Sequence, residues 1–493
     1  MNRQQQTIVT ATRRQYEVPP LQGGSAATCI QNTSSTAQFP ACRQPDDLTA
    51  ASSGLNAIPY STAGSPQCHE VDWPTQEQGS TTADVRLFML RNTNGMTVRI
   101  TNLGARLVSI TLPHDETAIE PDSCYTAEHD ISRRSCGTID VIQGYDSPAR
   151  YVDDPYYMGA VIGRLANRTK AARFTLNGKT YRLTANDGIN HLHGGNTGLH
   201  NRLWQATPQV RNKAATLVLQ CTSPDEEEGY PATLHLTATY TLTNDNTLRL
   251  ELSAATDDTA SVLTPVSLTA HPYFNLAGHD TATLDGHILT IHADRYLPPG
   301  GTPDKGTEGE KAQSAGVCEG TEQLTSAEGY SRIPAGKIYS VHGTPFDFNN
   351  PRDLTQALHE VPEGFDHYAI ITLPEAASVR HSQSGTEDTC PQLCHAATLH
   401  HAPTGRTMQV HTNQTGLQCY TANFIAPDTP GKNGVHYQPQ SAVCLEPHGY
   451  PNAVNNAHFP QIFVTEKQPH THITEYRFFT HKAQQGTALC RKA

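Results

Sequence analysis

Hydrophobic and polar positions alternate with a period of two through the middle of the chain. Apolar side chains occupy every second position of residues 234–242, and the same pattern returns in residues 248–252 after the turn-forming Asn-Asp-Asn at 244–246. Successive side chains of a strand point to opposite faces of a sheet. The pattern therefore predicts an antiparallel pair of strands with one buried face.

Two Asn-Gly pairs predict further hairpins. The pair at 177–178 separates alternating segments at 174–176 and 181–183, and the pair at 94–95 lies between two short apolar segments. Asn-Gly suits tight hairpin turns because both central residues of such a turn need a positive φ.

Strand-like segments recur along the rest of the chain, whereas no segment shows a convincing helical period of three and four. We interpret the chain as all-β, with many strands, few helices and long loops, arranged as either a sandwich or a barrel. The further segments that we expect to be strands are residues 103–112, 287–292, 398–411, 417–424, 441–445 and 474–479. Residues 139–145 are expected to be a strand or a loop.

The composition divides the chain into an N-terminal extension and one large domain. Residues 1–80 are rich in Gln, Ser, Thr, Pro and Gly without a sustained period, which predicts a poorly ordered extension rather than a docking tail. Residues 81–485 form the predicted domain, with surface insertions near 114–138, 300–331 and 375–395.

Charge and hydropathy exclude several classes of partner. The chain has 35 basic and 47 acidic residues, a formal net charge of −12, so we expect no nucleic-acid partner. Its N-terminus has no apolar signal region, and no apolar run is long enough to span a membrane. We therefore expect a cytoplasmic protein without a membrane partner, in which the 12 cysteines are mostly free thiols.

Charged and polar side chains flank the hairpin at 177–178. A hairpin brings its two ends together, so this spacing predicts that arginines and histidines share one sheet edge. A guanidinium beside imidazoles can hold and protonate a polyhydroxylated ligand. The residues concerned are Arg164, Asn167, Arg168, Asn190, His191 and His193. Of these, we interpret His191 as structural, because it faces away from His193 in an extended segment.

Four further motifs contain side chains capable of acid-base chemistry or sugar binding. Singly, each has an ordinary structural explanation: the chain contains 25 histidines, and acidic or amide side chains are common in turns and at strand ends. The residues are His271 in HPYFNLAG, Asp366 in GFDH, Gln418 in LQCYTANF and Glu446 in LEPHGYPNA.

Together with GRLANR and NHLHGG, these motifs resemble the aldose 1-epimerase (galactose mutarotase) family, in order and in spacing. The resemblance covers residues 84 to about 480 and implies a large antiparallel β-sandwich, with the site in a cleft on one sheet. It implies His271 as general acid and Glu446 as general base. The substrate-binding residues that it implies are Arg168, Asn167, His193, Asp366 and Gln418.

The implied activity is the interconversion of the α and β anomers of free aldohexoses such as galactose and glucose. The base takes the proton of the anomeric hydroxyl, the acid protonates the ring oxygen, and the opened ring closes on its other face. This chemistry needs neither a metal nor another cofactor. It does require that His271 and Glu446, which are distant in sequence, meet in the fold. Departures from the family pattern are Pro272, Cys419 and Pro447-His448.

Three alternatives remain at this point. The first is a non-catalytic carbohydrate-binding protein, which would not need a matched acid and base. The second is a hexose-6-phosphate 1-epimerase, which would need further arginines. The third concerns a metal: Cys390, Cys394 and His395, with His400 and His401 downstream, offer soft ligands, but we interpret their spacing as chance. We expect a monomer or homodimer with a small aldose as its partner.

Overall fold

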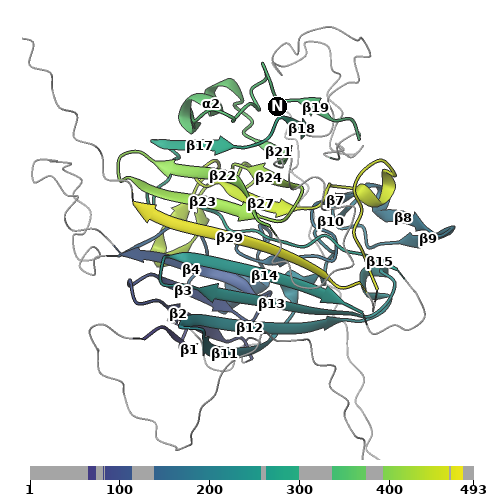
Figure 1. The fold of residues 1–493 in the computed structure, drawn as a ribbon, viewed down its shortest axis with the longest axis horizontal. Coiled ribbons are helices and arrows are strands. Elements are labelled where there is room, and N and C mark those ends of the chain that lie inside the picture. Colours follow the sequence, from purple (N-terminus) through teal and green to yellow (C-terminus); the bar gives the residue numbers. More distant parts are fainter. Residues whose placement is uncertain are drawn as a thin grey trace, which may run out of the picture. The chain divides into compact units, whose positions relative to one another are not determined.

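Nine antiparallel strands form the largest sheet of the computed structural model (Figure 1). In spatial order they are β11 (Gln205–Arg211), β12 (Ala214–Ser223), β13 (Leu234–Leu242), β14 (Thr247–Ala255), β29 (His470–Thr480), β23 (Arg406–Thr412), β22 (Cys394–His401), β17 (His287–Ile291) and β20 (Arg352–Asp353). The structure describes residues 65–73, 82, 84–113, 138–256, 263–298, 333, 336–372, 392–465 and 468–480.

Two five-stranded sheets supply the next layer. One has the order β1 (Gln67–Val71), β2 (Leu87–Arg91), β3 (Thr97–Thr101), β4 (Arg106–Pro113) and β5 (Thr138–Asp140). The other has the order β19 (Tyr339–Ser340), β18 (Arg295–Leu297), β21 (Asp366–Ile370), β24 (Gly416–Tyr420) and β27 (Cys444–His448). All pairings in both sheets are antiparallel.

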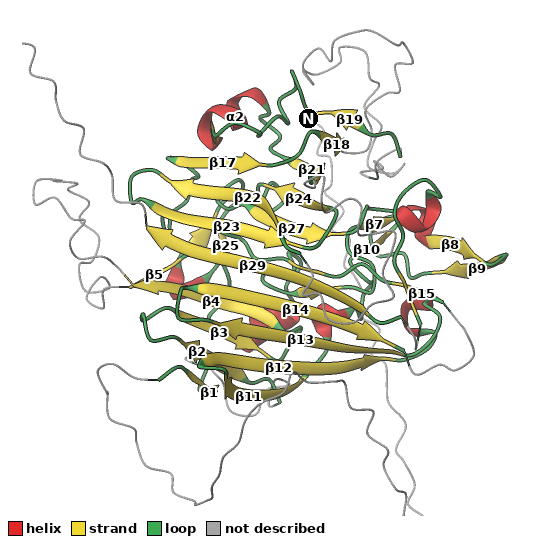
Figure 2. Cartoon of the chain, viewed as in Figure 1, coloured by secondary structure: helices red, strands yellow, loops and turns green. Residues whose placement is uncertain are grey.

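Short elements complete the fold. The two-stranded pairs are β6 (Val161–Ile162) with β16 (Thr269–Ala270), β7 (Arg168–Thr169) with β10 (His191–Leu192), β8 (Arg173–Leu176) with β9 (Lys179–Arg182), β15 (Thr264–Pro265) with β28 (Phe463–Val464), and β25 (Thr429–Pro430) with β26 (His436–Tyr437). The described α-helices are α1 (Pro148–Val152) and α2 (Leu354–Glu360), both short (Figure 2). Among the described residues no helix is long and apolar enough to cross a membrane.

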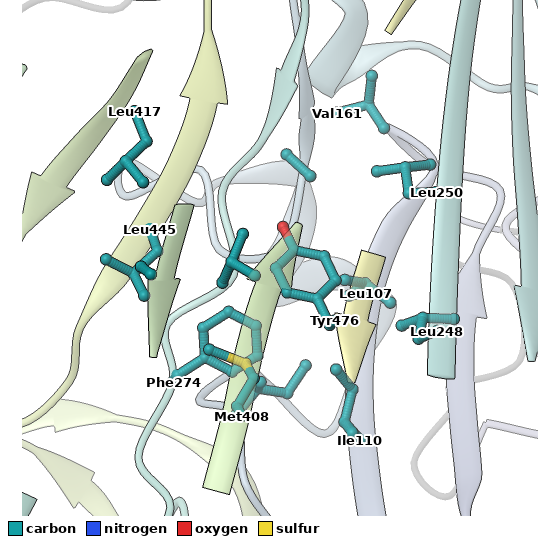
Figure 3. Close-up of a cluster of buried hydrophobic side chains, with 14 of the residues drawn as sticks. Leu107, Ile110, Val161, Leu248, Leu250, Phe274, Met408, Leu417, Leu445 and Tyr476 are labelled. Carbon is teal, nitrogen blue, oxygen red and sulfur yellow. The ribbon is translucent and has the colours of Figure 1, made fainter. Parts of the chain in front are cut away.

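One hydrophobic core joins the nine-stranded sheet to the two smaller sheets. Its side chains come from both layers and are almost fully buried, so the prediction of an all-β sandwich with few helices is confirmed. Figure 3 labels members from β4 (Leu107, Ile110), β14 (Leu248, Leu250), β23 (Met408), β24 (Leu417), β27 (Leu445) and β29 (Tyr476).

The predicted hairpins are present. In β13 the apolar positions are buried and the polar ones between them are partly exposed, as the alternation predicted. β8 and β9 are joined by Asn177 and Gly178, with φ values of 51° and 78°, the positive values that a tight turn needs. β2 and β3 pair across the second Asn-Gly, through a longer loop than the two-residue turn.

The structure corrects three boundaries. Residues 67–71, inside the predicted poorly ordered extension, form β1, because their backbone pairs with β2 along its whole length. Residues 394–395, placed in a predicted insertion, begin β22. The single strand expected at 398–411 is two strands, β22 and β23, joined by a turn. Residues 1–64, 114–137, 300–331 and 373–391 lie outside the described residues, as do the predictions made for them.

Candidate active site

Three neighbouring strands place polar side chains on one face of the five-stranded sheet. Gln418 of β24 is the direct partner of Glu446 of β27, and Asp366 of β21 is paired with Tyr420, two residues beyond Gln418. Residues two apart on a strand share a face. Asp366, Gln418 and Glu446 therefore line the same surface, and the last two are 7% and 2% exposed.

His271 reaches this surface from another part of the sandwich. It follows β16 directly, and its backbone is held at both ends: its N–H donates to Ala160 O, and its carbonyl accepts from Gly159 N–H, both at 2.9 Å. Its Nε2 lies 3.4 Å from Glu446 Oε1. The prediction that these two distant residues meet in the fold is confirmed.

The segments before and after the β8–β9 hairpin pack together, as predicted. Two hydrogen bonds join Asn167 and His193. The Asn167 N–H donates to His193 Nδ1 at 3.2 Å, and the His193 N–H donates to Asn167 O at 3.1 Å. The contact requires Gly194, because a Cβ there would collide with the carbonyl of Gly163. The His193 and His271 rings lie 5.6 Å apart.

A chain of hydrogen bonds links the hairpin segment to the sheet. Asn167 Nδ2 donates to Gln418 Oε1 at 3.1 Å, and Gln418 Nε2 donates to Asp366 Oδ1 at 2.6 Å. Arg168 lies beside this chain, and its Nε donates to Asp187 Oδ2 at 2.8 Å. The orientation of the Gln418 amide is thus set on both sides. The five expected substrate-binding residues and the expected acid and base therefore occupy one site.

Two residues of the predicted arginine-histidine cluster, Arg164 and His191, are buried and form hydrogen bonds inside the protein. Arg164 is 2% exposed, and its guanidinium donates to the carbonyls of Ser223, Pro224 and Pro231, so its expected part in gripping a ligand is wrong. A buried guanidinium needs acceptors, and backbone carbonyls supply them here. His191 is fully buried between the Thr184 carbonyl and the Tyr230 hydroxyl, consistent with the structural role expected for it.

Burial shifts the pKa values of both Glu446 and His271. It raises the pKa of Glu446 well above its usual value, and the nearby Asp366 carboxylate raises it further. Burial also lowers the pKa of His271 to about 3. Both shifts favour the uncharged forms, a neutral imidazole and a protonated carboxyl group. A proton that moves from Glu446 to His271 across the 3.4 Å contact leaves the net charge of the site unchanged.

Tyrosines surround the imidazoles, and the sequence analysis did not identify them as site residues. The Tyr273 ring stacks on His271 with centroids 5.0 Å apart, and Tyr420 meets the same ring edge-on at 6.1 Å. Tyr157 lies 4.8 Å from the His193 ring. One signal was available for Tyr273: it lies two positions after His271 and so shares its face in an extended segment.

The sequence analysis also did not identify Cys444 as a residue of this site. It lies two residues before Glu446 on β27 and is fully buried on the same side. Its sulfur, an imidazole nitrogen of His271 and a carboxylate oxygen of Glu446 all lie within 4.8 Å of one another. In the part of the chain that the structure describes, no other three histidine, cysteine or acidic side chains meet this closely.

The soft-ligand cluster noted in the sequence is only partly described. Cys390 lies outside the described residues, while Cys394 is buried at the start of β22. His395, His400 and His401 each contact a neighbouring threonine hydroxyl through one ring nitrogen. These residues do not converge on a common point among the described ones.

Comparisons of the sequence with known proteins identify similar chains. A family model described as aldose 1-epimerase matches residues 131–305 and 302–477. Galactose mutarotase from Bos taurus is 35% identical over 356 residues, which cover 72% of this chain and 88% of that protein. The human galactose mutarotase is 34% identical with the same coverage. Aldose 1-epimerase from Escherichia coli is 28% identical over 400 residues, or 80% and 95% of the two chains.

Solved structures show the same fold. A homologue of aldose epimerase from C. elegans aligns with a TM-score of 0.61 at 23% identity, over 79% of this chain and 98% of that one. A galactose 1-epimerase from Lactobacillus acidophilus aligns with a TM-score of 0.59 at 22% identity, over 85% and 100%. The fold is therefore the antiparallel β-sandwich of the galactose mutarotase type.

Proposed function

This chain belongs to the aldose 1-epimerase family and is an aldose 1-epimerase. We propose that it interconverts the α and β anomers of free aldohexoses, with Glu446 as general base and His271 as general acid. The observation that carries this assignment is the 3.4 Å contact between a buried carboxyl group and a buried imidazole. The reaction requires one group to take a proton while another gives one, and a carboxyl group beside an imidazole can do both.

The mechanism passes one proton through each of the two groups. The anomeric hydroxyl of the sugar donates a hydrogen bond to Glu446, which favours the carboxylate form of Glu446 and leaves the proton on His271. Glu446 then removes the hydroxyl proton while His271 protonates the ring oxygen, and the ring opens to the aldehyde. Rotation about the bond between C1 and C2 exposes the other face, and the reverse transfers close the ring. Each group contributes on the order of 10²–10⁴-fold.

The other polar residues orient the sugar. Gln418 is fixed between Asn167 and Asp366, so its amide presents a defined donor and acceptor at the edge of the acid-base pair. The Asp366 carboxylate accepts hydrogen bonds from sugar hydroxyls, while Arg168 and His193 contact Asn167 at the other end of the chain of hydrogen bonds. Holding a pyranose rigidly against the acid and base lowers the entropic part of the barrier.

The two competing functions receive no specific support. A carbohydrate-binding protein without activity has no use for a buried carboxyl group beside a buried imidazole. A hexose 6-phosphate substrate needs extra cationic side chains, but Arg164 is committed to interior carbonyls. We also propose a cytoplasmic location and a monomeric or homodimeric state.

Polarimetry tests the proposal directly. Freshly dissolved α-D-galactose and α-D-glucose are followed with wild type, Glu446→Gln and the matched control Glu363→Gln, whose carboxylate is exposed. We expect wild type and the control to equilibrate at least one sugar far faster than buffer, and Glu446→Gln to lose about 10²-fold or more. Wild type that is no faster than buffer refutes the function. Full activity of Glu446→Gln refutes the assignment of the base.

A further inference from the structure

Cys444 lies beside His271 and Glu446, so that the three side chains together offer a nitrogen, a sulfur and an oxygen atom to a metal ion. Cys444 and Glu446 project from the same face of β27, and His271 approaches them from the end of β16. The three residues are 0%, 2% and 5% exposed. Their nitrogen, sulfur and oxygen donor atoms lie within 4.8 Å of one another. The proposed mechanism uses two of these groups and leaves the thiol without a role.

We propose that His271, Cys444 and Glu446 bind Zn²⁺, or a cation of similar softness, and that the bound ion reversibly inhibits the enzyme. This inference rests on the proposed function, because inhibition is defined on the same acid-base pair. One imidazole, one thiolate and one carboxylate leave a fourth tetrahedral position for water, a ligand set typical of zinc. Hard cations such as Mg²⁺ prefer oxygen ligands and are poorly suited to a thiolate and an imidazole.

The geometry needs only a small adjustment to accept such an ion. With zinc–ligand bonds of about 2.0 to 2.3 Å, tetrahedral donors lie about 3.3 to 3.8 Å apart. The His271 Nε2 and Glu446 Oε1 atoms are already 3.4 Å apart. The largest separation in the set is at most 4.8 Å, so a movement of about 1 Å, within reach of a side-chain rotation, completes the site.

Inhibition follows from what the ion would occupy. It takes the Nε2 lone pair of His271 and the carboxylate of Glu446, so neither group can carry the proton that ring opening requires. A thiolate and a carboxylate neutralise the doubly charged ion, and binding releases the thiol proton of Cys444 to the solution. The ion and the sugar also compete for the same two side chains, His271 and Glu446.

The surroundings favour a reversible site over a resident one. A histidine that holds a permanent metal usually donates its other ring nitrogen to a carboxylate or carbonyl. Nδ1 of His271 is buried and has no hydrogen-bond partner within the described part of the chain. That missing support lowers the affinity for the ion and fits an inhibitor that a chelator removes.

The test measures inhibition and binding separately. Wild type, Cys444→Ser and the matched control Cys419→Ser are treated with EDTA and dialysed, then assayed by polarimetry with ZnCl₂ or MgCl₂. Cys419 lies on the neighbouring strand but packs into the core on the other face of the sheet. We expect Zn²⁺, not Mg²⁺, to inhibit wild type and Cys419→Ser, with reversal by EDTA and a rising apparent KM. Cys444→Ser should need about tenfold more Zn²⁺, because it lacks the thiolate.

Binding is read out independently with Co²⁺, whose coordination by a thiolate gives a charge-transfer absorption. We expect a band in wild type that is lost in Cys444→Ser and kept in Cys419→Ser. A band with no mutarotation in wild type refutes the proposed function but supports the metal site. An active wild type that shows neither zinc inhibition nor a band dependent on Cys444 overturns the metal site, whether or not the control variant folds.

Discussion

His367 should make the fold sensitive to acid. It follows Asp366 on β21, so it points to the core while Asp366 faces the active site. Its ring lies among aromatic side chains, 4.8 Å from Phe346 and 5.8 Å from Phe365. Neither ring nitrogen has a hydrogen-bond partner among the described residues. Burial lowers the pKa of His367 to about 3.

The direction and size of the stability change follow from the linkage between proton binding and folding. The unfolded chain holds His367 at an ordinary pKa of about 6.5, so below that pH the unfolded state binds more protons and gains stability. The stabilisation from a neutral His367 is complete above about pH 6.5 and is lost progressively as the pH falls toward the folded pKa of about 3. Between pH 8 and pH 5 the loss is about 2 kcal/mol.

Urea denaturation followed by circular dichroism measures this loss. Wild type should lose about 2 kcal/mol more of its free energy of unfolding between pH 8 and pH 5 than His367→Leu, which has no proton to bind. Other buried histidines contribute equally to both proteins and cancel. His359→Leu, at an exposed position of α2, is the matched control and should behave as wild type. Equal losses in wild type and His367→Leu would refute the reasoning.

Two further predictions test the site and the sandwich. Gln418→Leu removes the bonds to Asn167 and Asp366, so KM for galactose should rise about tenfold or more while circular dichroism stays unchanged; an unchanged KM would contradict the positioning role. Lys432→Met removes a buried ammonium that donates to Asp140 and to two backbone carbonyls, so the unpaired carboxylate should cost about 3 kcal/mol and lower the Tm; a Tm equal to that of wild type would show that this ion pair is replaceable.

Much of the fold was readable from local patterns. Alternation predicted β13 and β14, and Asn-Gly predicted the β8–β9 turn, because strand period and turn geometry depend on neighbouring residues alone. Ordered motifs indicated the family and named the residues that the structure brings together. Less could be read where a segment depends on a distant partner: β1 has a weak pattern of its own and is a strand only because β2 lies beside it.

The sequence by itself determined several of the strands, such as β13 and β14, the apolar face of these strands, and which side chains have acid-base chemistry. Only the tertiary structure decided that Arg164 turns inward to backbone carbonyls, and that Cys444 joins His271 and Glu446. The reason is that a side chain's partners across a sandwich are set by strand order and register, which long-range packing establishes. The periodicity of one segment contains no information about the segment that packs against it.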